Sequence, residues 1–180
     1  MNWRRHAALL IAAVWLAGCA TPPPAAPLPS GEPLSGRLSI RVDGTNGAAP
    51  RALTATFELL GDARTGRLDL STPLGSLLAQ ARWAPGSVAL VTPQGERRFD
   101  DLDALTREVV GESLPIAALF DWLRGRPWPG APSTATLPPA EAGFVQLGWT
   151  VSLAHLDEAS IAARREQAPA VVVRAKLDRP

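Results

Sequence analysis

An alternation of apolar and polar side chains over residues 36–99 constrains the fold of this chain more than any other feature. From Arg37 to Val42 every second side chain is apolar, and the pattern recurs at 53–59, 67–71 and 77–83, after which short turns lead into two further expected strands at 87–92 and 96–99. A period of two places successive side chains on opposite faces of a β-strand. Turns as short as Pro85-Gly86 join antiparallel neighbours. The sequence therefore predicts an antiparallel meander over this region.

After Phe99 the apolar period becomes helical. Asp100 is predicted to cap a helix that ends at Gly111 and has one apolar face, formed by Leu102, Leu105 and Val109. A second helix is predicted to run from Pro115 to Gly125. Further strands are expected near residues 144–147, 149–153, 161–165 and 171–178. Two short helices inserted among many strands indicate a curved antiparallel sheet with helices that cover one opening.

The N-terminus has the layout of a secretory signal. Arg4 and Arg5 precede an apolar run that ends at Leu16, and this run is too short to span a membrane. The sequence Leu16-Ala17-Gly18-Cys19 resembles the lipobox of bacterial lipoproteins, which predicts cleavage before Cys19 and a lipid on its thiol. Cys19 is the single cysteine, so it has no disulfide partner within the chain. The alternative is an ordinary signal peptide with a chance cysteine.

The chain therefore divides into a signal peptide at residues 1–18, a lipidated Pro-rich tether at 19–34 and a single domain at 35–180. Prolines at the density seen from Thr21 to Pro33 favour extended polyproline II. At about 3.1 Å per residue, this segment reaches on the order of 40 Å. Ala20 stands where an aspartate would resemble an inner-membrane retention signal. We therefore expect a lipid anchor in the cell outer membrane, with the domain facing the periplasm.

Composition and motifs argue against several other functions. Loss of Arg4 and Arg5 with the leader lowers a formal net charge of +1, so a nearly neutral domain gives no electrostatic case for binding nucleic acid. His155 is the one histidine outside the leader, which leaves no plausible zinc cluster. No Gly-x-Ser-x-Gly elbow and no phosphate-binding glycine motif is present. We expect a protein that is not an enzyme and that has no cofactor besides the covalent lipid.

Two groups of residues leave alternatives open. Asp100, Asp101 and Asp103 could act as paired carboxylates, but helix capping is the favoured interpretation. Four of the aromatic residues could bind a ligand, although sequence alone favours a role in core packing. These four are Phe57, Trp83, Phe120 and Trp122.

The segment from Ser71 to Ser76 is an unusual turn. Pro73 presets the turn and Gly75 permits a positive φ, yet Leu74 places a large aliphatic side chain at the expected tip. One interpretation is that Leu74 folds back onto the edge of the sheet. The other is that an exposed leucine, on a protein already tethered to a membrane, serves as an insertion point.

Together these features resemble the LolB family of outer-membrane lipoprotein receptors in Gram-negative bacteria. The resemblance is in good register over residues 36–129 and looser toward the C-terminus, where residues 156–180 match poorly. It rests on the lipobox followed by Ala20, the turn Thr72-Pro73-Leu74-Gly75, the helix from Leu114-Pro115 to Trp122-Leu123-Arg124-Gly125, and the strand start Gly148-Trp149. The resemblance implies a half-open antiparallel β-barrel whose helices cover an apolar cavity, which is the LolA/LolB-like fold.

The resemblance also implies a function. Such a chaperone accepts acylated lipoproteins from the periplasmic carrier LolA and inserts them into the inner leaflet of the outer membrane, without nucleotide or metal. In the family the leucine of the Pro-Leu-Gly turn serves membrane insertion, which maps onto Leu74, with Pro73 and Gly75 supporting it. The expected partners are LolA, cargo lipoproteins bound through their acyl chains, and outer-membrane phospholipid, and we expect a monomer.

Strand parity adds an expectation about the acyl cavity. Its predicted lining is Leu38, Ile40, Phe57, Leu70 and Trp83, with Phe120 and Trp122 from the covering helix. The main alternative to the transfer function is a structural outer-membrane lipoprotein that acts as a subunit of a larger envelope complex.

Overall fold

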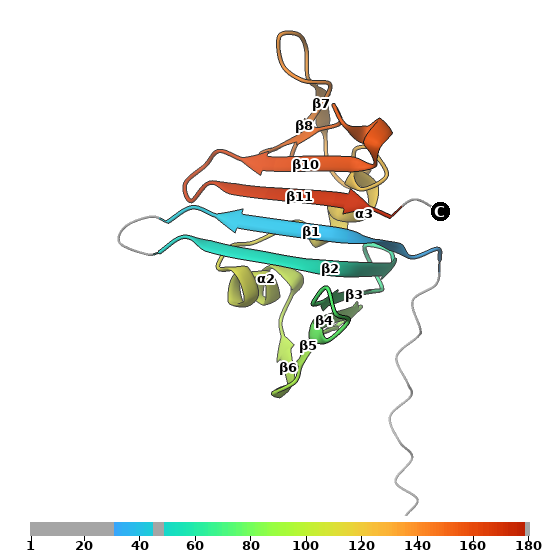
Figure 1. Ribbon diagram of the computed structural model, residues 1–180, viewed down its shortest axis with the longest axis vertical. Helices are drawn as coiled ribbons and strands as arrows, with labels where there is room; N and C mark the ends of the chain where they lie inside the picture. Colours follow the sequence, from blue (N-terminus) through green and yellow to red (C-terminus); the bar gives the residue numbers. More distant parts are fainter. Residues whose placement is uncertain (1–30, 45–48, 179–180) are drawn as a thin grey trace, which may run out of the picture.

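The computed structural model describes residues 31–44 and 49–178, and these form one antiparallel sheet with two α-helices against one face (Figure 1). The predicted signal peptide, Cys19 and most of the predicted tether lie outside the described residues. The strands are β1 (Leu34–Val42), β2 (Arg51–Gly61), β3 (Gly66–Ser71), β4 (Leu77–Ala84), β5 (Ser87–Thr92), β6 (Gly95–Phe99), β7 (Ser133–Ala135), β8 (Gly143–Gln146), β9 (Trp149–Ser152), β10 (Ser160–Arg165) and β11 (Val171–Leu177). The helices are α2 (Leu102–Val110) and α3 (Ile116–Trp122), with a short 3-10 turn, η2 (Leu156–Glu158).

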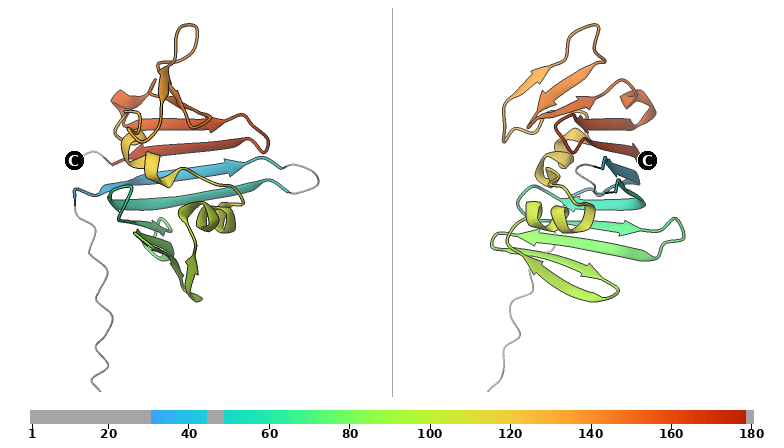
Figure 2. Two further views of the ribbon diagram at one scale, coloured as in Figure 1. Left: turned by 180° about the vertical axis from the view of Figure 1, so that it is seen from behind. Right: turned by 90° about the vertical axis from the view of Figure 1, so that its left-hand side faces the viewer.

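The strands follow the order β6-β5-β4-β3-β2-β1-β11-β10-β9-β8-β7. Strands β1 and β11 therefore join the N-terminal meander to the C-terminal strands, in a register that runs from Gly36 opposite Leu177 to Val42 opposite Val171. A Cβ atom at Gly36 would collide with the Lys176 carbonyl oxygen, so glycine permits this close pairing. The sheet curves around the helices and its edge strands, β6 and β7, stay apart (Figure 2). This is the predicted half-open antiparallel β-barrel.

The alternation in the sequence determines which face of the sheet is buried. In β1, Leu38, Ile40 and Val42 point inward and are buried, whereas Arg37 and Arg41 are exposed on the other face. The hydrophobic core that results extends from Leu38 to Ala175 and draws on both halves of the sheet and on both helices. The segment after residue 30 thus contains a hydrophobic core of its own.

The predicted helix after Phe99 is confirmed as α2, but its cap is Asp101 and not Asp100. Asp101 has an extended backbone, and its Oδ1 accepts a hydrogen bond from the Ala104 amide at 2.6 Å. This is the geometry of an N-cap, whose side chain satisfies an amide in the first turn. The helix ends as predicted at Gly111, which has a φ of 90° and donates its amide to the Arg107 carbonyl.

Two other differences from the sequence prediction concern short elements. Helix α3 ends at Trp122, and the residues up to Gly125 continue as turns in place of helix. Strand β7 was not predicted, because its three residues are all exposed and show no apolar alternation. It forms the edge of the sheet through its pairing with β8.

Candidate functional site

An apolar pocket lies between the concave face of the sheet and the two helices. Its walls come from the central strands of the sheet, from α2 and α3, and from the connection between the helices. The space between these walls, out to the mouth, is about 760 Å³, but only about 50 Å³ of it admits the centre of a water-sized sphere. The pocket is therefore narrow, with room for a few water molecules. Leu102, Val109 and Leu119 line it and are only half-buried, so they lie toward its mouth.

None of the described residues that line the pocket carries a charged side chain. Thr106 is the one polar residue among the described residues that form it. The Thr106 hydroxyl donates to the Asp103 carbonyl at 3.2 Å and accepts from the Leu114 amide at 3.0 Å, so its hydrogen-bonding capacity serves the helix and the connection that follows it. The pocket consequently offers a purely apolar surface and suits a hydrocarbon ligand.

The structure brings four of the seven predicted cavity residues to the pocket wall: Leu38, Ile40, Leu70 and Trp122. The other three, Phe57, Trp83 and Phe120, are buried but do not line it. Trp83 packs edge-on against Phe120 at a centroid separation of 5.9 Å and donates its indole N–H to the Asp62 carbonyl at 3.1 Å. These residues form part of the core beside the pocket.

Aromatic contacts hold α3 across the two halves of the sheet. Phe120 packs against Trp83 of β4 on one side. On the other side, Trp122 lies 6.2 Å from Trp149 of β9 and 6.4 Å from Phe144 of β8, ring centroid to ring centroid. Such pairs contribute about 0.5–1.5 kcal/mol each beyond the burial of their area. The C-terminal end of helix α3 is therefore held on two sides, by β4 through Phe120 and by β8 and β9 through Trp122.

A buried glutamine, which the sequence analysis did not single out, fixes the Trp122 end of α3. Gln146 is 1% exposed. Its Oε1 accepts from Trp122 Nε1 at 2.8 Å and from the Trp128 amide at 2.9 Å, while its Nε2 donates to the carbonyls of Trp128 and Ala131, both at 2.7 Å. All four bonds available to an amide side chain are made. The signal in the sequence was the parity of β8, which places Gln146 on the inward face with Phe144.

An ion pair ties the connection between the helices to the end of β10. Arg165 contacts Glu112 at 2.7 Å, and both side chains are largely buried. The guanidinium also lies 5.5 Å from the centroid of the Trp149 ring, which lines the pocket. This pair holds the segment between α2 and α3 against the sheet.

The turn between β3 and β4 presents Leu74 to solvent. Leu74 is 95% exposed, so its side chain does not fold back onto the sheet. The Thr72 amide donates to the Ser76 carbonyl at 2.8 Å, and the Gly75 amide donates to the Thr72 carbonyl at 2.9 Å. Gly75 has a φ of +84°, which favours glycine. A braced turn thus holds a leucine at its tip, with Pro73 and Gly75 in the positions expected from the sequence.

Leu77 and Leu78 extend the apolar character of this turn. They are 41% and 38% exposed, directly after the tip. Leu77 pairs with Ser71, across a register shift between Leu70 and Ser71, at the end of β4 next to the turn. The turn is anchored from β2, where Thr56 Oγ1 donates to the Ser71 carbonyl at 3.1 Å.

The turn between β2 and β3 contains a carboxylate with a shifted pKa. The backbone amides of Thr65 and Arg64 donate to Asp62 Oδ1 at 2.9 and 2.7 Å. These hydrogen bonds, the one from Thr65 first, stabilise the carboxylate and lower the pKa of Asp62 below its ordinary value. Asp62 does not line the pocket, and these hydrogen bonds brace the turn between β2 and β3.

The described residues offer neither a metal site nor a membrane-spanning helix. In the part of the chain that the structure describes, no group of three or more His, Cys, Asp or Glu side chains could hold a metal ion. No helix among residues 31–44 and 49–178 is long and apolar enough to cross a membrane.

Comparison with known proteins identifies the family. A family model described as outer membrane lipoprotein LolB matches residues 33–172. The chain belongs to the LolB family. The outer-membrane lipoprotein LolB of Bordetella petrii is 33% identical over 178 residues, which cover 92% of this chain and 87% of that protein. Those of Chromobacterium violaceum and Cupriavidus pinatubonensis are also 33% identical, over 82% and 94% of this chain and 81% and 84% of theirs.

Membership of the LolB family places this chain at the outer membrane as a lipid-anchored protein. The family works in lipoprotein trafficking, and its cargo is lipoprotein. The apolar pocket and the exposed leucine turn are the two features of this structure that a protein handling lipid-modified cargo would use.

Proposed function

We propose that this chain accepts acylated lipoproteins from the periplasmic carrier LolA and inserts them into the inner leaflet of the outer membrane. The observation that carries the proposal is the wholly apolar pocket beneath α2 and α3, on the same domain as a turn that exposes Leu74. The pocket holds the acyl chains of the cargo, and the turn engages the membrane that receives them.

Acyl chains need more room than the narrow pocket offers, so binding requires the helices to move outward. The residues that pack between the helices and the sheet are aliphatic and uncharged at the pocket wall. Outward movement therefore exchanges one set of apolar contacts for another, and each buried methylene of the cargo contributes about 0.8 kcal/mol. The aromatic attachments of α3 and the bonds of Gln146 act as its fixed end during this movement.

Leu74 provides a weak second contact with the membrane. Burial of one leucine contributes roughly 1.5–3 kcal/mol, which is too little to hold a soluble domain on a bilayer. Beside the expected lipid on Cys19, that amount suffices to orient the domain and to disturb lipid packing locally. No nucleotide or metal is required, because the acyl chains move from a partly filled pocket to a bilayer that solvates them fully.

The test measures acceptance and delivery separately. Residues 31–180 are mixed with a triacylated lipoprotein bound to its carrier, and the transfer of cargo to the domain is followed by affinity capture. Full-length protein in phospholipid vesicles then reports delivery. We expect native protein to perform both steps, and Leu74→Glu to accept cargo normally but to deliver it at least tenfold more slowly.

Leu137 supplies a matched control, since it is 76% exposed in the loop between β7 and β8, far from the β3–β4 turn (Figure 1). Leu137→Glu should leave both steps unchanged. A folded domain that extracts no cargo from the carrier would overturn the proposal and favour a structural lipoprotein. Unchanged delivery by Leu74→Glu would remove Leu74 from the mechanism.

A further inference from the structure

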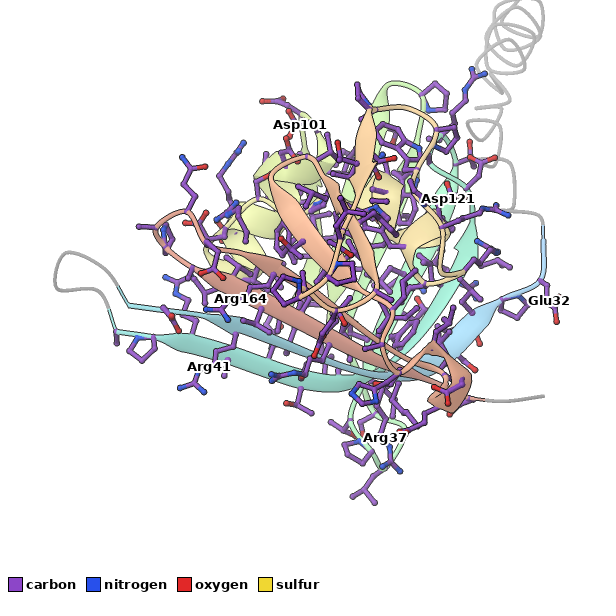
Figure 3. All side chains as sticks on the ribbon, turned by 90° about the horizontal axis from the view of Figure 1, so that it is seen from above. Glu32, Arg37, Arg41, Asp101, Asp121 and Arg164 are labelled. Atoms are coloured by element: carbon purple, nitrogen blue, oxygen red, sulfur yellow. The ribbon has the colours of Figure 1, made fainter. Side chains whose placement is uncertain are left out.

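The outer face of the four central strands is strongly basic. At the outward positions of β2, β1, β11 and β10 the described residues include one carboxylate, Glu58, and five exposed cations, which we call the basic face: Arg37, Arg41, Arg164, Arg174 and Lys176. Figure 3 shows Arg37 and Arg41 pointing away from the sheet on the side opposite to Asp101 and Asp121 of the helical layer. The pocket and the basic face thus lie on opposite sides of the sheet.

The central part of the basic face brings like charges together. Arg37 lies directly opposite Lys176 in the register, and Arg174, opposite Ser39, follows on the same face. Like charges in such positions destabilise a sheet. Among the described residues, Arg37 and Arg174 have no ion pair or hydrogen bond, and the Lys176 ammonium donates to the Glu158 backbone carbonyl. This arrangement fits an anionic surface outside the protein.

Most carboxylates that lie nearby are already in ion pairs, and Asp178, which lines the same surface hollow as Arg37, accepts a hydrogen bond from the Ser35 hydroxyl at 2.9 Å. Arg41 and Arg164, at the far end of the face, contact Asp43 at 3.9 Å and Glu166 at 2.8 Å. Toward the leucine turn, Arg67 contacts both Glu58, at 2.8 Å, and Asp69, at 3.0 Å. The positive charge of Arg37 and Arg174 is therefore left for a partner.

The basic face adjoins the leucine turn. Lys176, Arg37, Thr56 and Ser71 form one row across β11, β1, β2 and β3, and Ser71 is the last strand residue before the turn. Neighbouring strands lie about 4.8 Å apart, so the Arg37 backbone is roughly 10 Å from the base of the turn. Figure 2 shows the β3–β4 turn extending beyond the outer face of the sheet. Leu74 and the guanidinium of Arg37 consequently face the same side.

We propose that the basic face docks on anionic phospholipid headgroups when Leu74 enters the membrane. This inference deepens the proposed function and rests on it for the role of Leu74. Basic side chains near an anionic leaflet are attracted within a Debye length of it, and each strengthens association by roughly fivefold. The contact would fix the orientation of the domain, because a domain that touches the membrane through Leu74 alone can still rotate about that point. β1, the strand that carries Arg37, is also the strand to which the predicted tether is joined.

The test is flotation of residues 31–180 with vesicles of phosphatidylglycerol and phosphatidylethanolamine, compared with vesicles of phosphatidylcholine. We expect binding to the anionic vesicles that weakens with added salt. Arg37→Gln with Arg174→Gln should weaken this binding by about thirtyfold. Arg37→Lys with Arg174→Lys should retain it, because the charge is kept. Arg98→Gln with Arg107→Gln makes the same change of charge on β6 and α2 and should have no effect.

Three outcomes would contradict the proposal. The Arg37→Gln/Arg174→Gln protein could bind anionic vesicles as tightly as native protein. Native protein could bind neutral vesicles equally well. The variant could bind vesicles normally but accept cargo poorly, which would assign the basic face to the carrier. Cargo acceptance measured without vesicles separates the two proposals: a domain that binds anionic vesicles but accepts no cargo refutes the proposed function alone.

Discussion

Replacement of Gln146 by leucine probes the attachment of α3 most directly. Leucine has a similar volume to glutamine, but it cannot make the two hydrogen bonds that Gln146 Oε1 accepts or the two that Nε2 donates. The Trp122 indole N–H is left buried without an acceptor, because Trp122 is 1% exposed. A buried donor without a partner costs about 1–3 kcal/mol. Trp128 and Ala131 are only half-buried, so in the variant water can reach their backbone groups, and the expected total loss is about 2–4 kcal/mol.

This loss is a large fraction of the stability of a domain, which is typically about 5–15 kcal/mol. The assay is urea unfolding of residues 31–180, followed by tryptophan fluorescence. With an m-value of about 2 kcal/mol/M, the midpoint for Gln146→Leu should fall by about 1–2 M. Gln94, exposed in the turn between β5 and β6, gives the control variant Gln94→Leu, for which we expect a change within about 0.5 kcal/mol. A Gln146→Leu protein as stable as native would refute the reasoning.

Three further predictions follow from the pocket and its surroundings. Leu119→Glu places an unpaired charge at the pocket wall and should reduce cargo acceptance at least tenfold in the capture assay, whereas Ala117→Glu, on the same helix but outside the lining, should not. Glu112→Gln weakens the pair with Arg165 and should lower the free energy of unfolding by about 1–2 kcal/mol in urea, and an unchanged value would contradict a structural role for this pair. Because the pKa of Asp62 is lowered in the fold, its carboxylate stabilises the protein above the ordinary aspartate pKa, and this contribution is lost as pH falls through the folded value. The difference in unfolding free energy between native protein and Asp62→Asn should therefore be larger at about pH 6 than at about pH 2. An equal difference at the two pH values would argue against stabilisation by the Asp62 carboxylate.

The sequence predicted elements whose cause is local. The alternation in Arg37–Val42 fixes which side chains of β1 are buried, and Gly111 ends α2 because a left-handed residue suits glycine. The choice between Asp100 and Asp101 as the cap was wrong by one residue, since both offer the same carboxylate and only the backbone path decides between them. The pairing of β1 with β11 had no local signal, because it joins residues more than a hundred positions apart.

At the candidate site, too, the sequence predicted what has a local cause and missed what depends on contacts between distant segments. Parity placed Leu38 and Trp83 on one face of the sheet, but the position of the helices decides which inward side chains line the pocket and which pack beside it. Gln146 was missed because the value of a buried amide depends on partners from α3 and the following loop, which the sequence does not place. Leu74 could be singled out because a large apolar residue at the tip of a turn departs from ordinary turn chemistry.

The central claim is that the apolar pocket receives the acyl chains of cargo. The most direct measurement uses a lipoprotein with a photoreactive group at the end of one acyl chain, loaded onto the full-length protein from its carrier and then irradiated. Mass spectrometry should find cross-links to pocket residues of α2 and α3, such as Leu105, Val109 and Leu119. Cross-links confined to the outer face of the sheet, or to the carrier alone, would contradict the claim.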